Sequence, residues 1–251
     1  MFKEERCQEI LRLLRENGFL TVEYLSQKLH YSPATIRRDL VHMEQNGMIE
    51  KSYGGASLAQ NDKRHVLPYD LRKRSYSQEK KKIASIAAGL IKDNQVIFID
   101  GSTTATGIID FLDPHRNITV VTNNLENCIK LRESGIRGFC TGGEILPSTP
   151  SLGGKVTCDM LSSVNIDLMF FASKSLSLDG NISEHSESMT STIKSAMKSS
   201  SQIVYLTDSS KLGTTSMFNI CSLSEVDIVI SERDISALFP ATIATATRFL
   251  Y

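Results

Sequence analysis

The sequence predicts an α/β protein of two domains: a small helical domain that ends in a β-hairpin, and a larger domain built on a mostly parallel sheet. Three observations predict this division. Three amphipathic helical patterns and a glycine hairpin signal lie within residues 1–58. A polar stretch at 59–76 shows no apolar periodicity, and across 77–251 short β-branched runs alternate with helical patterns. We therefore expect domains at 1–58 and 77–251, joined by a linker at 59–76.

Two helices are expected at the start of the chain. Apolar residues recur at i, i+3, i+4 and i+7 across Cys7–Leu14, and Gly18 ends this pattern. Thr21 is a suitable N-cap for a second helix, whose apolar stripe runs through Val22–Leu29. The short connection to the next helix, His30–Ser32, has the length found in helix-turn-helix motifs.

The third helix has the clearest signals. Ser32 is a strong N-cap residue and Pro33 is favoured at the first helical position, so we expect the helix to begin at Pro33. Ile36, Leu40 and Met43 fall on one narrow stripe, which predicts a helix that packs on one side and is free on the other.

A β-hairpin is expected after this helix. Gly47 is suited to end the helix, because glycine adopts the left-handed conformation without a Cβ clash. Residues 48–53 alternate loosely and turn at Gly54–Gly55. Three helices followed by a ribbon predict a winged helix-turn-helix domain, in which the third helix enters a DNA groove.

The segments TIRRDL, NG and YGGA within residues 35–56 closely resemble the N-terminal domain of the DeoR family of bacterial transcription regulators. In that family the arginine pair lies in the recognition helix, so the resemblance implies binding to double-stranded operator DNA. The departures are mild. Lys51 and Tyr53 stand where many members carry arginine and histidine before the glycine pair.

The two arginines are expected to have different roles. The first turns of a recognition helix reach base edges, so Thr35 and Arg38 are assigned to bases. Arg37, about 100° away from Arg38 around the helix, is assigned to a phosphate. Asp39 faces the packed side and is expected to pair within the protein. A solvated cationic helix face is the alternative interpretation. The expected DNA-binding residues, with the wing reaching the backbone or minor groove, are Ser32, Thr35, Arg37, Arg38, His42, Lys51 and Tyr53.

Composition predicts a globular cytoplasmic protein. Hydrophobic residues make up 41% and charged residues 22% of the chain, and neither a membrane-spanning apolar run nor a cleavable signal is found. The formal net charge is +0, although residues 1–74 are slightly basic and the remainder slightly acidic. The 5 cysteines are scattered without a C-x-x-C pair, so neither a metal nor another cofactor is expected.

A parallel sheet covered on both faces is expected in the larger domain. The linker before this domain carries a basic cluster at Arg72–Arg74, which is interpreted as a solvated face or a DNA phosphate contact. After the linker, Ser77 is expected to cap a helix. Ligands of such sheets bind beyond the carboxyl ends of the strands. The expected strands lie at residues 96–99, 118–121, 168–171, 203–206 and 228–230.

Asp100–Thr104 follows the first of these strands and is expected to open a helix that runs to Leu112. Its glycine permits close backbone approach, its hydroxyls donate hydrogen bonds, and a helix N-terminus attracts anions. This pattern favours a phosphate site. The alternative is that these hydroxyls are plain N-caps.

Further segments resemble, in order and spacing, the C-terminal effector domain of the DeoR family: Asp100–Thr104, Val121–Asn124, Thr141–Gly143, Leu152–Gly154, Asp167 and Asp208–Lys211. The resemblance thus covers nearly the entire chain. That domain is related in fold to ribose-5-phosphate isomerase and glucosamine-6-phosphate deaminase, which implies a phosphorylated sugar as ligand. The residues implied to bind phosphate are Gly101, Ser102, Thr103 and Thr104, and those implied to surround the sugar are Asp100, Thr122, Asn123, Gly143, Lys194 and Lys211.

Two departures bear on this pocket. The segment from Phe170 to Lys174, which includes Ala172, replaces a glycine-rich segment of the family and implies a narrower pocket. Thr190 stands four residues before Lys194, where many members have an acidic residue. The ligand therefore differs from the usual one, or the sensor responds weakly.

The expected function is that of a homo-oligomeric, DNA-binding transcription regulator without enzymatic activity. We expect it to repress carbohydrate-metabolism genes and to be relieved by a phosphorylated sugar, with no membrane partner. One alternative is a sugar-phosphate isomerase-like enzyme, although the chain lacks the Asp-Gly-Ala-Asp-Glu and Lys-Gly-Gly-Gly motifs of such isomerases. The other is a regulator whose sensor has lost its ligand.

Overall fold

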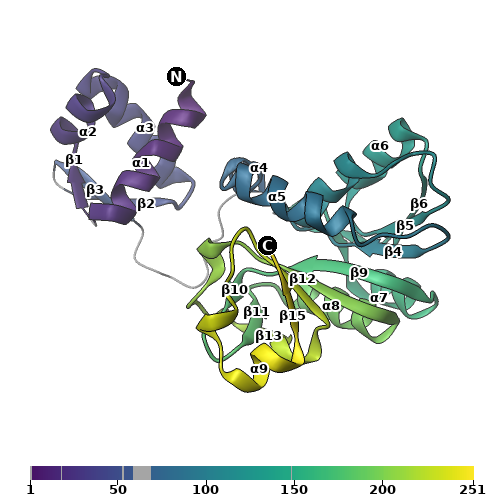
Figure 1. Cartoon of the computed structure of the whole chain (residues 1–251). Helices are drawn as coiled ribbons and strands as arrows, with labels where there is room; N and C mark the ends of the chain where they lie inside the picture. The colour runs from purple at the N-terminus through teal and green to yellow at the C-terminus, as the bar shows by residue number, and fades with distance from the viewer. Residues whose placement is uncertain (1, 18, 53, 59–68, 148) are drawn as a thin grey trace. The chain divides into compact units, whose positions relative to one another are not determined.

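The computed structural model describes residues 2–17, 19–52, 54–58, 69–147 and 149–251. The chain divides into two compact units between Leu71 and Arg72, and each unit is described by itself (Figure 1). This division falls inside the expected linker. Residues 59–68 lie outside the described part, but Tyr69–Arg74 forms a short helix, α4, where no structure was expected.

The N-terminal unit contains three helices and a small antiparallel sheet. The predicted helices and wing strands are confirmed, whereas β1 was not predicted; it pairs with β3, so the wing is three-stranded in the order β1-β3-β2. The elements are α1 (Lys3–Asn17), β1 (Phe19–Thr21), α2 (Val22–Leu29), α3 (Pro33–Gln45), β2 (Ile49–Ser52) and β3 (Gly55–Leu58).

The predicted caps hold these helices in place. The Thr21 hydroxyl accepts a hydrogen bond from the N–H of Tyr24 at 3.1 Å, and the Ser32 hydroxyl accepts one from Thr35 at 3.2 Å. Gly47 has a φ of 66°, the left-handed conformation expected beyond α3. The apolar stripes of α1, α2 and α3 meet in one buried core.

The C-terminal unit is built on a sheet of seven strands in which every neighbouring pair is parallel. The five predicted strands are confirmed, whereas β6 and β15 were missed. In spatial order the strands are β15 (Arg248–Leu250), β14 (Ile228–Ile230), β12 (Ser200–Leu206), β9 (Ile166–Ala172), β4 (Val96–Ile99), β5 (Thr119–Thr122) and β6 (Arg137–Cys140).

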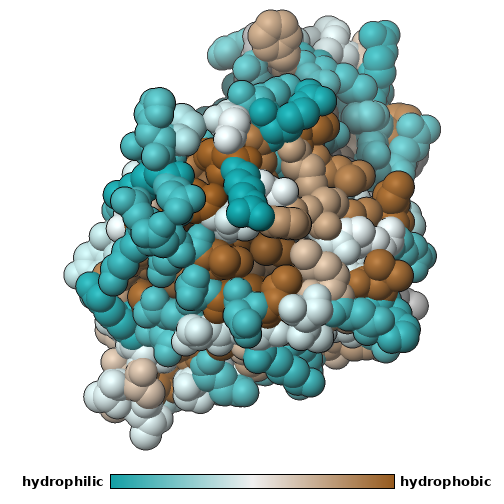
Figure 2. All heavy atoms as spheres, turned by 90° about the vertical axis from the view of Figure 1, so that its right-hand side faces the viewer, coloured by the Kyte–Doolittle hydropathy of each residue, from teal (hydrophilic) through white to brown (hydrophobic). Residues whose placement is uncertain are grey.

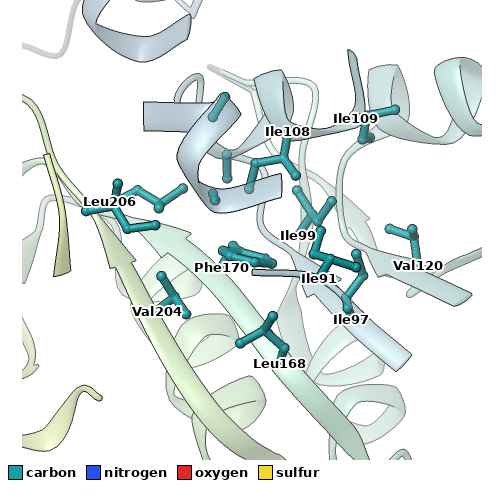
Figure 3. Packing of buried hydrophobic residues seen from close by; sticks show 14 of the residues in the cluster. Ile91, Ile97, Ile99, Ile108, Ile109, Val120, Leu168, Phe170, Val204 and Leu206 are labelled. Atoms are coloured by element: carbon teal, nitrogen blue, oxygen red, sulfur yellow. The ribbon is translucent and has the colours of Figure 1, made fainter. Parts of the chain in front are cut away.

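Helices cover both faces of this sheet, because successive residues of each strand point to opposite sides. Ile97 and Ile99 pack beneath one layer, formed by α5 (Ser77–Ala88), the 3₁₀ helix η1 (Ala105–Phe111) and α6 (Leu125–Ser134), as Figure 3 shows. Phe98 packs in the opposite core with residues of α7 (Gly154–Ser162), α8 (Glu187–Lys198) and α9 (Ala241–Ala246).

Smaller elements border the carboxyl ends of the strands. A three-stranded antiparallel sheet, in the order β10-β11-β13, and the β7-β8 pair were not predicted. No described helix is long and apolar enough to span a membrane. The remaining elements are β7 (Glu144–Ile145), β8 (Leu152–Gly153), β10 (Ser175–Leu176), β11 (Asn181–Glu184), η2 (Ser209–Lys211), β13 (Phe218–Ser222), η3 (Leu223–Glu225) and η4 (Ser236–Leu238).

Two local predictions were wrong. Ser77 is not an N-cap: it is the first residue of α5, and Tyr76 takes the capping position with a φ of 54° and no side-chain cap bond. The segment after Asp100 forms turns followed by the 3₁₀ helix η1, which begins only at Ala105. The α-helix N-terminus expected to face a phosphate is therefore not formed there.

Candidate functional site

The recognition helix α3 presents one open face. Ile36, Leu40 and Met43 are buried, while Arg38 and His42 are exposed on the other side. Ser32 is exposed at the N-terminus of the helix, Thr35 is half-buried, and their hydroxyls lie 3.0 Å apart. The structure thus brings together the predicted base-reading side chains in the first turns of α3, where a recognition helix meets base edges.

The two arginines of α3 differ in their surroundings. The guanidinium of Arg37 lies 3.9 Å from the carboxylate of Glu23 on α2. Arg38 makes no hydrogen bond or ion pair with any described residue, and its side chain is exposed. Arg38 is therefore free to form the paired hydrogen bonds with a guanine edge that are the commonest specific contact to DNA.

Asp39 fixes α3 against α1, as its predicted inward direction required. Its carboxylate accepts hydrogen bonds from Nε and Nη2 of Arg6 at 2.5 and 3.0 Å, and both side chains are buried. The guanidinium of Arg6 also stacks 4.4 Å from the centre of the Tyr31 ring. The hydrogen bonds and charge of Asp39 raise the pKa of Arg6 despite its burial.

The predicted contacts from the wing are less direct. Lys51 is exposed, but its ammonium lies 3.2 Å from the carboxylate of Glu44 on α3. Tyr53 lies outside the described residues. The carbonyl of His42 accepts a hydrogen bond from Asn46 at 2.7 Å.

In the C-terminal unit, Asp100 lies at the centre of the carboxyl edge of the sheet. One carboxylate oxygen accepts bonds from the N–H and hydroxyl of Ser102 at 3.0 and 2.5 Å, and the other accepts one from the N–H of Ala172 at 3.3 Å. Burial raises the pKa of Asp100 to about 7, against the opposing effect of these bonds. Because its hydroxyl serves Asp100, Ser102 is less available to a phosphate than expected.

The residues after β5 form a buried polar network. Thr122 donates its hydroxyl hydrogen to the carbonyl of Ile99 at 2.8 Å and accepts a bond from Asn127 at 3.0 Å. The amide of Asn123 donates to the carbonyl of Leu152 at 2.9 Å, but its Oδ1 is buried and has no hydrogen-bond partner among the described residues. An unpaired buried acceptor is costly, so Oδ1 of Asn123 is suited to accept a ligand hydroxyl.

The two predicted glycine positions are explained by packing within the chain. A Cβ on Gly101 would collide with the side chain of Ser151, and one on Gly143, whose φ is 115°, would collide with Thr157. The side chain of Ser151 thus fills the space beside the Gly101 backbone where the sequence predicted a phosphate. Thr104 is buried as well, which leaves Thr103 as the more accessible residue of the turn.

A group of charged residues, which we name the charge cluster, lies beside these strand ends. Burial lowers the pKa of Lys80 to about 8; Asp208 opposes this change, whereas Lys211 and Arg72 add to it. Its ammonium donates hydrogen bonds to the carbonyls of Arg72 and Ser75. The charge cluster comprises Arg72, Lys80, Asp100, Glu184, Asp208 and Lys211.

Glu184 and Asp208 complete the charge cluster. Burial disfavours the charge of Glu184, but hydrogen bonds from His185 and the charges of His185 and Arg72 outweigh it and lower the pKa. One oxygen of Asp208 accepts a bond from the N–H of Ser210 at 3.0 Å, while Oδ2 is buried and accepts no hydrogen bond within the described part of the chain. The sequence missed Lys80 and Glu184. Lys80 shares the buried stripe of α5 with Ile83, and a lysine on an apolar stripe was the available signal.

A cavity of about 230 Å³ opens next to this cluster, between α5, η1 and α6. Lys80 of the charge cluster and Thr103 of the predicted phosphate turn both line it. Lys73 and Lys130 each form an ion pair at 2.6 Å, with Glu126 and Asp110. The other two lining lysines have no ion pair with any described residue, and together with the lining hydroxyls they are suited to an anion. The polar lining residues are Lys73, Ser77, Lys80, Lys81, Thr103, Thr106, Asp110 and Lys130.

Other predicted residues lie apart or serve the fold. Lys194 is exposed on α8 within electrostatic range of Cys221 on β13, and no described contact joins it to the charge cluster. The Thr190 hydroxyl donates to the carbonyl of Ser186 at 2.8 Å. The N–H of Lys174 donates to Glu184 at 3.0 Å. The described residues contain no group of three or more acidic, histidine or cysteine side chains that could hold a metal ion.

Known families match both units. The model of the DeoR-like helix-turn-helix domain matches residues 6–62, and the model of the DeoR C-terminal sensor domain matches residues 75–233. The chain is 31% identical over 237 residues to the HTH-type transcriptional regulator GolR of Listeria innocua, covering 94% of this chain and 93% of that protein. It is 30% identical to the glycerol-3-phosphate regulon repressor of Escherichia coli K12, covering 92% of each.

A third relative agrees with this pattern. The HTH-type transcriptional repressor GlcR of Bacillus subtilis is 33% identical over 236 residues, covering 93% of this chain and 90% of that protein. Ribose-5-phosphate isomerase A of Methanocaldococcus jannaschii is similar to 55% of this chain and 55% of its own, with a TM-score of 0.41 and 17% identity.

Proposed function

This chain belongs to the DeoR family of transcription regulators, and we propose that it represses carbohydrate-metabolism genes until a phosphorylated sugar binds its C-terminal unit. The relatives reported above are named as transcriptional regulators and repressors, and one of them acts on a glycerol-3-phosphate regulon. The chain is therefore a DNA-binding regulator. The ligand, its site and the assembly on DNA are the proposed parts.

The DNA contact depends most on one observation: Arg38 is exposed on the free face of α3 and pairs with none of the residues that the structure describes. Beside it, Ser32, Thr35 and His42 supply hydrogen-bonding groups to bases and phosphates. Arg37 and Lys51 each have an acidic partner in the protein, so their cations serve the phosphate backbone after exchanging that partner. Two copies place two such helices on the half-sites of an operator.

The ligand site depends most on the lysine-lined cavity of about 230 Å³. We assign the phosphate to this cavity, where Lys80, Lys81 and Thr103 converge. The unpaired buried oxygens of Asn123 and Asp208 at the strand ends are suited to accept hydrogen bonds from sugar hydroxyls. Asp100, Thr122 and Lys211 remain candidates to surround the sugar, whereas Lys194 is left out of the proposed site.

One residue of the cavity, Lys80, also contacts the segment that precedes α5 and leads to the N-terminal unit. Lys80 lines the cavity and holds the carbonyls of Arg72 and Ser75, which lie at the end of α4. A bound phosphate attracts the Lys80 ammonium and competes with these carbonyls for its hydrogen bonds. Ligand binding therefore weakens the contact between Lys80 and the end of α4. Linkage requires the reciprocal effect, so operator DNA lowers the affinity for the sugar.

The experiment is a titration of the full chain with a labelled fragment of its own promoter, read by fluorescence anisotropy. We expect tight binding to the promoter over a random duplex, and release when one member of a panel of sugar phosphates is added. Equal, salt-governed binding to both duplexes would overturn the assignment as a specific repressor. If every sugar phosphate fails to shift the thermal unfolding of the protein, the sensor has lost its ligand. Catalytic turnover of a panel member would instead favour an isomerase-like enzyme.

A further inference from the structure

The strand β6 forms an open edge of the seven-stranded sheet. It pairs with β5 on one side, all four of its residues are exposed, and no described strand pairs with its other side. Thr141, the next residue, donates its N–H to Thr122 at 3.0 Å. Alternate residues of a parallel strand direct their N–H and C=O groups to opposite sides, so Gly138 and Cys140 direct theirs outward. The edge therefore offers hydrogen-bonding groups to an additional strand.

Exposed apolar side chains flank this edge on both faces of the sheet. On the α6 side, Leu125 and Ile129 are 37% and 51% exposed. On the α7 side, Phe139, Ile145 and Val156 are 44%, 66% and 62% exposed. Figure 2 looks onto this side of the molecule and shows hydrophobic residues gathered between hydrophilic ones. We name these five residues the edge patch; a group of this kind beside an unpaired strand is typical of an interface.

A groove of about 290 Å³ also opens between α6 and β6. Leu131, Ile136, Gly138 and Phe139 are among the residues that line it. Gly138 has no side chain to cover the strand, and Leu131 fills the space where its Cβ would lie. Gly138 therefore lets α6 pack close to β6, and the residue itself remains exposed at the edge.

The charges around the edge favour a second copy of the same chain. Arg137 lies at the start of β6, with its guanidinium 5.4 Å from the centre of the Phe139 ring, and Glu144 lies just beyond the end of the strand. Glu144 is exposed and forms no ion pair with any described residue. In an antiparallel pair the start of each strand lies near the end of the other. Arg137 of each copy would then approach Glu144 of its partner, which is the self-complementarity of a two-fold contact.

We propose that β6 pairs antiparallel with β6 of a second copy of this chain across a two-fold axis, which joins the two sheets and buries the edge patch. Directly opposed residues of an antiparallel pair share a face, and the register centred on Phe139 brings the two phenyl rings together. Gly138 then exchanges both backbone hydrogen bonds with Cys140 of the other copy. This contact deepens the proposed function, which requires two copies on one operator.

Sedimentation of the full chain tests the surface. Phe139→Glu puts two carboxylates against each other at the axis, so we expect it to convert the dimer to a monomer at micromolar concentration. Met217→Glu is the matched control, because Met217 is 76% exposed and precedes β13, outside the edge patch, and should leave the dimer intact. A wild-type monomer, or a Phe139→Glu variant that remains a dimer, would overturn the proposal.

Disulfide trapping tests the register even if Phe139→Glu impairs folding. In a Cys140→Ser background, Phe139→Cys should form a covalent dimer on mild oxidation, because opposed non-hydrogen-bonded residues bring their Cα atoms to about 4.5 Å. Met217→Cys in the same background should not. Failure of Phe139→Cys to cross-link would reject this register. The proposed ligand site is tested separately, since monomeric Phe139→Glu should still show a thermal shift with the sugar phosphate that acts on the wild type.

Discussion

The ammonium of Lys80 donates a hydrogen bond to the carbonyl oxygen of Ser75 at 2.7 Å, which ties α5 to the segment that follows α4. The same ammonium bonds to the carbonyl of Arg72 and lines the lysine cavity. A single buried cation thus contacts both the proposed phosphate site and the end of the helix that leads from the N-terminal unit. A change in the protonation of Lys80 therefore affects both contacts.

Binding of the sugar phosphate should take up a proton near pH 8. Burial lowers the pKa of Lys80 to about 8, so about half of the molecules lack its charge at that pH, and a bound dianion restores it. Calorimetry in buffers of different ionisation enthalpy should measure about half a proton at pH 8 and much less at pH 6, where Lys80 is already charged. Lys80→Met should lose this uptake. Equal uptake in Lys80→Met would show that another group titrates.

The stability of the C-terminal unit should fall as the pH rises toward 7. Burial raises the pKa of Asp100 to about 7 from an unfolded value near 3.8, so between these values the folded chain holds a proton that the unfolded chain has released. Unfolding is then favoured by about 1.4 kcal/mol for each pH unit, and the loss is complete above pH 7.

Urea denaturation of the wild type and of Asp100→Asn, measured across this range, should reveal that slope as a difference between the two proteins. The amide introduced by this substitution does not titrate, so the curve of the variant supplies the contribution of all other groups. Parallel curves for the two proteins would mean that Asp100 is already ionised at low pH in the folded chain.

Loss of the Asp39 carboxylate should destabilise the N-terminal unit strongly. Asp39→Ala leaves the buried guanidinium of Arg6 without its partner, at a cost of about 3–5 kcal/mol. Glu9→Ala, which breaks the exposed pair with Arg12, should cost at most about 1 kcal/mol. Hydrogen exchange in α1 and α3 of the full chain measures both, and similar protection in the two variants would contradict the assignment of Asp39 as an anchor.

Arg38→Ala should reduce affinity for the operator by about 1–3 kcal/mol, or about 5- to 150-fold, and reduce discrimination against random DNA. The matched control is Arg12→Ala, which removes one exposed arginine from α1 of the same unit, where it pairs with Glu9 and Glu16. Anisotropy titrations on operator and random duplexes separate the two variants. Equal losses on both duplexes would identify Arg38 as a phosphate contact.

Local signals made the N-terminal unit predictable. The caps Thr21 and Ser32 and the stripe from Ile36 to Met43 are properties of neighbouring residues, and the structure confirms each of them. The five predicted strands could be found because each contains a continuous apolar run, mostly β-branched or aromatic, that is buried between the two layers of helices.

The missed features depend on contacts distant in sequence. β6 contains Gly138 and only one large apolar residue, and β15 begins with Arg248, so neither forms an apolar run of the length found in the predicted strands. Gly101 was interpreted as an open approach for phosphate, yet Ser151, fifty residues later, fills that space. Lys80 was not singled out, because the backbone carbonyls of Arg72 and Ser75 that accept its hydrogen bonds are known only from the structure.

Lys81→Ala should weaken binding of the sugar phosphate by about 1–2 kcal/mol, or about 5- to 30-fold, because Lys81 lines the cavity and has no ion pair with any described residue. Lys82→Ala is the closest control: Lys82 is the next residue of α5 and equally charged, but it bonds to the carbonyl of Glu232 at 2.9 Å and does not line the cavity. Calorimetric titration should show a loss for Lys81→Ala and wild-type affinity for Lys82→Ala. Both variants remove one positive charge. If they bind the sugar phosphate with equal affinity, Lys81 acts only through long-range attraction, and the phosphate binds elsewhere at the strand ends.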